Sequence, residues 1–255
     1  MKRSVKILWR LFIGGTLTVI GLFVAANFGL FGKMPSVEEL QNPEADLATE
    51  IYTSDGILMG KYYAENRSEV KYSEISKNVI NALVATEDER FYEHSGIDAQ
   101  AVARAVFTLG KDGGGSTLTQ QVAKMMLGQG KGSTLTRGFQ KIKEWIVAVK
   151  LERNFTKQEI LTLYLNTVPF SENLFGVSNA SRSFFQKEPD RINVQEAAVL
   201  IGMLKGATLY NPKRNPKIAL DRRNVVMSQM VKNGKIIKTT YDTLKIKPIE
   251  LNYKK

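Results

Sequence analysis

Two hydrophobic patterns divide this chain. Residues 11–32 are uncharged and predominantly apolar, and as a helix they would extend about 33 Å, enough to cross the hydrocarbon core of a bilayer. After a polar stretch, apolar residues recur at steps of three and four from about Ser76 onward, which is the period of amphipathic helices. The pattern therefore predicts one transmembrane helix followed by a mainly α-helical domain.

These patterns predict five segments. They are an N-terminal segment at 1–10, a transmembrane helix at 11–32, a linker with a β-hairpin at 33–63, a folded domain at 64–233 and a linker-like tail at 234–255. The hairpin is expected where two short runs rich in Ile and Tyr flank a Ser-Asp-Gly turn at 54–56.

Spacing and capping residues locate the first helices of the domain. One apolar stripe at helical spacing predicts a single helical face: Ile80, Leu83, Val84, Glu87 and Phe91. Asp98 is a candidate N-cap for a second helix that stops at Gly110. Glycine-rich stretches then flank a third helix, which begins after Thr117.

The second half of the domain shows the same signals. A long helix is expected over 137–153, with an inner face of Phe139, Ile142, Ile146 and Val149. Capping boxes, in which residues N-cap and N3 exchange hydrogen bonds, predict two further helices. Their residue pairs are Thr156 with Glu159 and Asn193 with Glu196. A last helix is expected over 218–233.

Positive charge at the N-terminus orients the predicted transmembrane helix. Four basic residues precede it: Lys2, Arg3, Lys6 and Arg10. Cytoplasmic flanks of membrane helices are enriched in Lys and Arg, so we expect a single-pass protein of the cytoplasmic membrane, with an extracytoplasmic domain. A cleaved signal peptide is the alternative, although the apolar segment is long for one and no clear Ala-x-Ala site closes it.

Composition removes several classes of chemistry. The chain has no Cys and one His, which excludes disulfides, thiol nucleophiles, iron–sulfur clusters and multi-His metal sites. Its 36 Lys and Arg against 25 Asp and Glu give a net charge of +11, which indicates an anionic partner. A basic domain beside a membrane suits lipid headgroups and phosphate-bearing substrates, so no nucleic-acid partner is expected.

Two glutamates are candidates for acid–base chemistry. Glu87 continues an apolar stripe, so its carboxylate is expected to point inward, as a general acid or base would. Glu144 lies among the cations Arg137, Lys141 and Lys143, which could hold a diphosphate. For each cluster taken alone, a solvated helix end or a salt-bridged surface face is the alternative.

Two further features belong to this picture. His94 follows Glu87 by seven residues and is expected on the same helical face, as a hydrogen-bond partner rather than a catalyst. The glycines before Ser116 and Thr117 could present N–H groups to a phosphate at a helix start, with Lys124 further along that helix. Alone, the glycines would indicate a hinge.

The order of these clusters resembles a known family. Residues 85–96 (ATEDERFYEHSG) and 114–121 (GGSTLTQQ) with Lys124 are similar to the first two motifs of glycosyltransferase family 51. Its members are the peptidoglycan glycosyltransferases of class A penicillin-binding proteins and their monofunctional relatives. Residues 141–144 resemble the third motif and 157–166 the fourth, and the resemblance spans about 50–230.

The resemblance implies a fold and a reaction. The fold is an α-rich, lysozyme-like lobe with a membrane-embedded jaw. The enzyme polymerises lipid II, with the growing glycan strand on undecaprenyl diphosphate as donor and with inversion at the anomeric carbon. No cofactor is required, and a divalent cation, Mg²⁺ or Mn²⁺, is an optional addition without dedicated protein ligands. Implied partners are lipid II, the glycan strand, the phospholipid membrane and proteins of the division or elongation machinery.

Roles carry over to matching positions. Glu87 corresponds to the general base, and Glu144 to the second essential carboxylate. Lys124, Arg137 and Lys141 would stabilise the departing diphosphate. Contacts to donor phosphate and sugar would come from Ser116, Thr117, Gln120 and Gln121. Asp88, Phe91 and His94 would support the site.

The chain departs from the family pattern at two positions. Gln140 stands where an Arg usually precedes the third-motif Lys, and Arg137 is one helical turn away from it. Ser171 replaces a common Gly. The Lys-rich tail resembles the start of a linker, so we expect a fragment of a bifunctional enzyme rather than a monofunctional one. Two other functions stay open: a lysozyme-like hydrolase or lytic transglycosylase, and a non-catalytic membrane-anchored cell-wall scaffold.

Overall fold

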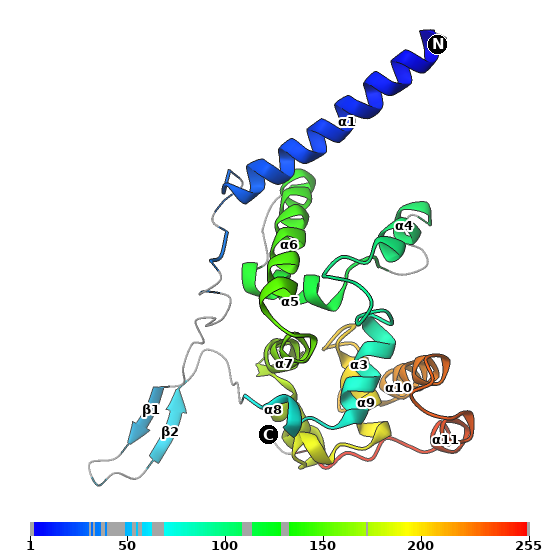
Figure 1. Cartoon of the computed structure of the whole chain (residues 1–255). Helices are drawn as coiled ribbons and strands as arrows, with labels where there is room; N and C mark the ends of the chain where they lie inside the picture. The colour runs from blue at the N-terminus through cyan, green and yellow to red at the C-terminus, as the bar shows by residue number, and fades with distance from the viewer. Residues whose placement is uncertain are drawn as a thin grey trace.

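The computed structural model describes residues 3–30, 32, 34–36, 39, 49–52, 55, 58–62, 69–108, 114–128, 133–171 and 173–253, and it confirms a mainly α-helical fold (Figure 1). The helices are α1 Arg3–Asn27, α3 Lys77–Glu87, α4 Ala99–Phe107, α5 Leu118–Leu127, α6 Thr134–Asn154, α7 Lys157–Thr167, α8 Val177–Phe185, α9 Val194–Met203, α10 Pro216–Lys232 and α11 Lys238–Leu244, with short 3₁₀ turns η1 Tyr72–Glu74 and η2 Pro189–Arg191. The strands are β1 Thr49–Tyr52, β2 Leu58–Tyr62, β3 Pro169–Ser171 and β4 Leu174–Phe175.

Helix α1 overlaps the predicted transmembrane segment at 11–32 but begins and ends earlier in the chain. Helix α1 begins at Arg3 and ends at Asn27, because apolar residues precede the uncharged run and Gly29 adopts a positive φ of 79°. The part from Arg3 to Ala26 is long and apolar enough to cross a membrane, with a mean hydropathy of 1.9.

The predicted hairpin is confirmed. Strands β1 and β2 pair antiparallel, with Thr49 opposite Tyr62 and Glu50 opposite Lys61, and the register shifts after Ile51. A second antiparallel ribbon, β3 with β4, was not predicted, since its strands are only three and two residues long.

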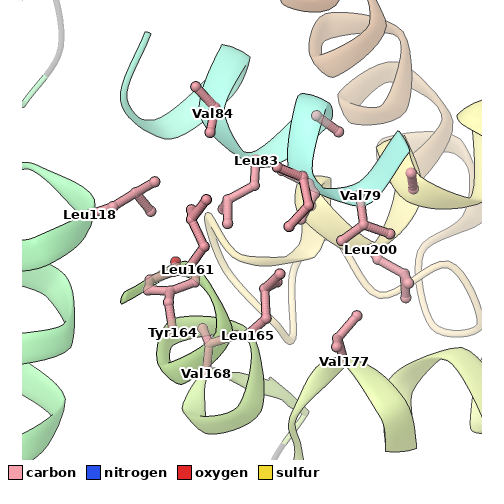
Figure 2. Packing of buried hydrophobic residues seen from close by; sticks show 14 of the residues in the cluster. Val79, Leu83, Val84, Leu118, Leu161, Tyr164, Leu165, Val168, Val177 and Leu200 are labelled. Carbon is pink, nitrogen blue, oxygen red and sulfur yellow. The ribbon is translucent and has the colours of Figure 1, made fainter. Parts of the chain in front are cut away.

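The core lies where α3, α5, α7, α8 and α9 meet (Figure 2). Leu83, Leu118, Leu161 and Leu200 come from four of these helices, and each is fully buried. Helix α9 is apolar on nearly all sides because it packs against α3, α8 and α10. Burial of each large side chain contributes about 1.5–3 kcal/mol, so these contacts fix the helices that carry the site.

The predicted inner face of α6 is wrong. Phe139, Ile142, Ile146 and Val149 are only half-buried, and the buried side consists of Glu144, Val147, Ala148 and Leu151. The reason is that α6 has a second neighbour, since Phe23 of α1 stacks on Trp145 with ring centroids 6.2 Å apart. In Figure 1 the C-terminal end of α1 lies against the start of α6. The face of α6 that points into the domain is therefore mostly apolar, and Glu144 is its one charged member among these four residues.

The segment predicted as a linker-like tail folds back on the domain. Helix α11 packs against α10, and the guanidinium of the buried Arg223 donates to the carbonyls of Leu244, Lys245 and Pro248 at 3.2–3.3 Å. Further on, the Asn252 N–H donates to the Phe184 carbonyl at 3.0 Å. Sequence patterns missed these contacts because backbone carbonyls are the acceptors, and every residue has one.

Candidate functional site

A cleft of about 860 Å³ lies between α5, α6 and α7. Seven of the twelve predicted site residues line it: Ser116, Gln120, Gln121, Lys124, Arg137, Lys141 and Glu144. The other five lie outside its lining: Glu87, Asp88, Phe91, His94 and Thr117. Seven residues chosen from the sequence therefore share one cleft.

Glu144 lies in the cleft with a cation beside it. The residue is 5% exposed, and the Lys141 ammonium lies 3.0 Å from its Oε2. The same ammonium donates to Ser116 Oγ at 2.8 Å. A buried carboxylate requires such a partner because desolvation of an unpaired charge is costly. Lys141 therefore holds Glu144 and also presents positive charge to the cleft.

Glu87 reaches the cleft through a second residue. It is the last residue of α3 and is half-buried, and Gln121 Nε2 donates to its Oε2 at 3.2 Å. Gln121 Oε1 in turn accepts a hydrogen bond from the Tyr164 hydroxyl at 3.1 Å. Burial and the nearby charge of Glu87 raise the pKa of Tyr164, so this phenol stays protonated. Sequence analysis placed Tyr164 in a motif but gave it no role in the site.

His94 does not share a helix with Glu87, so the prediction of a common helical face is wrong. Helix α3 ends at Glu87, where Asp88 adopts an extended φ of −158°, and the chain turns before Phe91 and His94. His94 Nε2 lies 3.0 Å from both oxygens of Asp88. Asp88 Oδ2 also accepts from the Leu118 N–H at 2.9 Å. This carboxylate thus joins the end of α3 to the start of α5.

Two residues predicted to contact substrate form hydrogen bonds to a turn. Thr117 Oγ1 and Gln120 Nε2 both donate to the Gly96 carbonyl, at 2.7 and 3.2 Å. Gly96 has a φ of 89°, and a Cβ there would lie 2.9 Å from the Ala148 carbonyl oxygen of α6. Among the described residues, Gln120 Oε1 has no hydrogen-bond partner, and Gln120 lines the cleft. The hydrogen bonds of Thr117 and Gln120 therefore hold the turn at Gly96.

A polar cluster that sequence analysis missed supports this turn. Glu152 Oε1 accepts from Thr119 Oγ1 at 2.6 Å and from Lys157 Nζ at 2.8 Å. Lys157 Nζ also donates to the His94 carbonyl at 2.7 Å and lies 4.3 Å from the centre of the Phe91 ring. These residues come from α5, α6, α7 and the turn, so no local pattern could have grouped them.

Comparison with known proteins identifies the family. Residues 55–231 match the family model described as Transglycosylase, which is more than half of the chain. The chain belongs to the Transglycosylase family. The residues that line the cleft described above all lie within the matched range.

Several similar proteins are much longer than this chain. Penicillin-binding protein 1A/1B of Bacillus subtilis is 39% identical over 94% of the chain, which spans 26% of that protein. Penicillin-binding protein 1A of Aquifex aeolicus is 37% identical over 94% of the chain and 34% of its own length. The chain of a crystal structure of penicillin-binding protein 1A from Haemophilus influenzae is 25% identical, with a TM-score of 0.48, over 83% of this chain and 22% of its own. The chain thus spans about a quarter to a third of these relatives.

Two further cations line the cleft. Lys124 and Arg137 line it together with Lys141, an arrangement suited to a phosphate or diphosphate. Gln140 also lines the cleft, and its Nε2 donates to the Gly128 carbonyl at 3.2 Å. Within the described ranges, His, Asp and Glu side chains form no group of three that could hold a metal ion.

Proposed function

We propose that this chain is a peptidoglycan glycosyltransferase domain. It polymerises lipid II into glycan strands at the outer face of the cytoplasmic membrane and releases undecaprenyl diphosphate. The observation that carries the proposal is the pairing of two carboxylates with unlike surroundings: Glu144 bound to Lys141 in the cleft, and Glu87 bound to Gln121 at its wall. Unlike surroundings allow two carboxylates to take different roles in one reaction.

The proposed reaction gives Glu87 and Glu144 separate roles. Glu87 takes the proton from the 4-hydroxyl of the incoming lipid II as that oxygen attacks the anomeric carbon of the donor glycan. The new glycosidic bond forms as the bond from the anomeric carbon to the diphosphate oxygen breaks, and the configuration at that carbon inverts. Glu144 keeps Lys141 in place beside the leaving group.

The leaving diphosphate carries away the bonding electrons, so it needs positive charge. Lys124, Arg137 and Lys141 line one cleft and supply that charge. A divalent cation is an optional addition in this proposal, held by the diphosphate rather than by a protein cluster.

The same proposal gives the chain a place in the cell. Helix α1 anchors it as a single-pass protein of the cytoplasmic membrane, with the N-terminus in the cytoplasm and the catalytic domain outside. The four basic residues before the uncharged run support this orientation. Its partners are then lipid II, the growing strand, the phospholipid bilayer and proteins of the division or elongation machinery.

Incubation of the full chain with purified lipid II in detergent tests the reaction. We expect glycan polymer on a gel, and no shortening when preformed glycan strands are supplied instead. Shortening of preformed strands without polymer formation would identify a hydrolase or lytic transglycosylase and refute the proposal.

The role of Glu87 separates an enzyme from a scaffold. We expect Glu87→Gln to abolish polymerisation while folding and lipid II binding persist, because the amide cannot accept the proton. Glu93→Gln is the matched control, since Glu93 is exposed and lies in the same turn region. Full polymerisation by Glu87→Gln would remove Glu87 from the mechanism.

A further inference from the structure

We infer that Tyr164 is a positioning residue for Glu87, acting through the side-chain amide of Gln121. The inference rests on the proposed role of Glu87 as the general base. It adds to that role a three-residue chain of hydrogen bonds, Tyr164 to Gln121 to Glu87, which crosses from α7 through α5 to α3.

The chain of hydrogen bonds has a defined direction. The Tyr164 hydroxyl lies 3.1 Å from Gln121 Oε1, and Gln121 Nε2 lies 3.2 Å from Glu87 Oε2. Tyr164 is 2% exposed, so water does not compete for its hydroxyl. Tyr164 and Gln121 both line the cleft, whereas Glu87 does not. The pair therefore forms the contact through which the cleft wall sets the position of Glu87.

The direction follows from the chemistry of a glutamine amide. Its two ends have nearly the same shape, but one is an acceptor and the other a double donor. With the amide reversed, Gln121 Oε1 would face an ionised Glu87 and two acceptors would repel each other. A hydroxyl that donates to Oε1 stabilises the orientation in which Nε2 donates to Glu87.

The burial of Tyr164 makes it a dependable donor. Desolvation and the charge of Glu87 both disfavour a phenolate, so they raise the pKa of Tyr164. The residue keeps its proton across the range in which an enzyme works. A serine or a water at this place could rotate and donate elsewhere, whereas a phenol ring is held by its packing.

The arrangement has a consequence for proton transfer. Within the described residues, Glu87 has no other side-chain hydrogen bond, so its Oε1 is free to receive a proton from a substrate hydroxyl. The bond from Gln121 fixes Oε2 and thereby sets the direction of Oε1. Loss of this bond is expected to let the carboxylate rotate.

Tyr164→Phe tests the inference with little change in packing. We expect kcat for lipid II polymerisation to fall about 3- to 10-fold, which matches the loss of one hydrogen bond. KM is expected to stay within about twofold, because no substrate contact is removed. Tyr241→Phe, on α11, is the matched control and should change none of these quantities.

A double-mutant cycle separates positioning from a structural role. Gln121→Met removes the amide at similar size, and we expect its loss of kcat to equal that of the double variant Tyr164→Phe with Gln121→Met. If the two losses multiply instead, Tyr164 does not act through Gln121, and the inference is overturned. An unchanged kcat in Tyr164→Phe would overturn it as well.

A measurement without substrate keeps the inference separate from the proposed function. In the ¹⁵N-labelled full chain in detergent, the side-chain NH₂ signals of Gln121 are those missing from Gln121→Met. We expect Glu87→Gln to change the chemical shifts of these signals, and to change them less when Tyr164→Phe is also present, because the amide is then no longer held in one orientation. An equal change in both backgrounds refutes the positioning role even if lipid II is polymerised. A smaller change in the Tyr164→Phe background supports it even if lipid II is not the substrate.

Discussion

Lys141 and Glu144 lie one helical turn apart on α6, and the ammonium of the first is 3.0 Å from a carboxylate oxygen of the second. The lysine is partly exposed and the glutamate is buried. Because Lys141 also contacts Ser116, it connects α6 to the segment before α5. This one cation thus serves the fold and the chemistry of the cleft together.

We predict that Lys141→Met lowers kcat/KM for lipid II polymerisation about 10²- to 10³-fold, as the loss of one donor to a developing anion does. It should also lower the melting temperature, because Glu144 is left buried without its cation. Rate assays and thermal unfolding check both effects. Lys150→Met, on the same helix but outside the cleft lining, is expected to change neither by much.

Asp88→Asn should destabilise the domain and reduce activity together. The carboxylate holds the Leu118 N–H and His94, and loss of a charged hydrogen bond in a buried place costs about 1.5–3 kcal/mol. Denaturant unfolding and polymerisation assays measure the two losses. Asp242→Asn breaks only exposed ion pairs and serves as the control. Wild-type stability of Asp88→Asn would contradict the role of this carboxylate in joining α3 to α5.

The lowered pKa of Asp98 should make the stability of the domain depend on pH. Burial alone would raise its pKa, but hydrogen bonds from the Ala101 N–H and the Arg90 guanidinium outweigh it and lower the pKa. A lowered pKa in the folded state adds stability above the unfolded value of about 3.9, and this stability is lost as pH falls.

The matching variant is Asp98→Asn, which keeps a good N-cap and loses the charge. We expect it to be about 1 kcal/mol less stable than wild type at pH 7, with the difference shrinking as the pH falls below the unfolded value of about 3.9. Unfolding curves across this range provide the measurement, with exposed Asp190→Asn as control. A difference that stays constant with pH would argue against the ion pair as its cause.

Gly96→Ala combines two penalties. A positive φ of 89° costs an alanine about 1 kcal/mol, and the 2.9 Å approach to the Ala148 carbonyl oxygen adds a clash. We expect a total near 3 kcal/mol and a loss of activity, since the turn holds Thr117 and Gln120. Gly234→Ala has a similar φ of 64° and open space around its Cβ, so it isolates the backbone term. Equal losses in the two variants would exclude the clash.

Arg223→Met should release the C-terminal segment. The guanidinium is buried, and its burial lowers the pKa, yet its partners are carbonyl and amide oxygens rather than carboxylates. Loss of these bonds leaves several carbonyls unpaired, at about 1–3 kcal/mol each where they stay buried. Limited proteolysis after Lys245 should speed up, while lipid II polymerisation should change less than in the Lys141 variant. Arg222→Met is the neighbouring control.

The sequence predicted most of the helices because their signals are local. Asp98 caps α4, and both capping boxes, at Thr156 and Asn193, form as predicted. The sequence also grouped the cleft residues Ser116, Gln121 and Lys141, since they lie in segments that resemble known motifs. A cap needs only neighbours in the chain, so tertiary packing rarely alters it.

The predictions that are wrong concern features that tertiary packing determines. Helix α6 packs against Phe23, which lies more than a hundred residues earlier in the chain. The spacing of apolar residues within α6 does not show which of two neighbouring elements they face. His94 was placed on the helix of Glu87 because a seven-residue step looks helical, although the chain turns at Asp88. The network of Glu152 and Lys157 joins four segments, so no window of sequence contains it.

The stacking of Phe23 on Trp145 gives helix α1 a mechanical connection to the cleft. Trp145 directly follows Glu144 in α6, and Phe23 lies one turn before the end of α1. A membrane helix changes its tilt when the thickness of the bilayer changes. For a bilayer-spanning α1, such a change would push on α6 at the turn that carries Glu144. Lipid chain length thereby becomes a variable of the cleft.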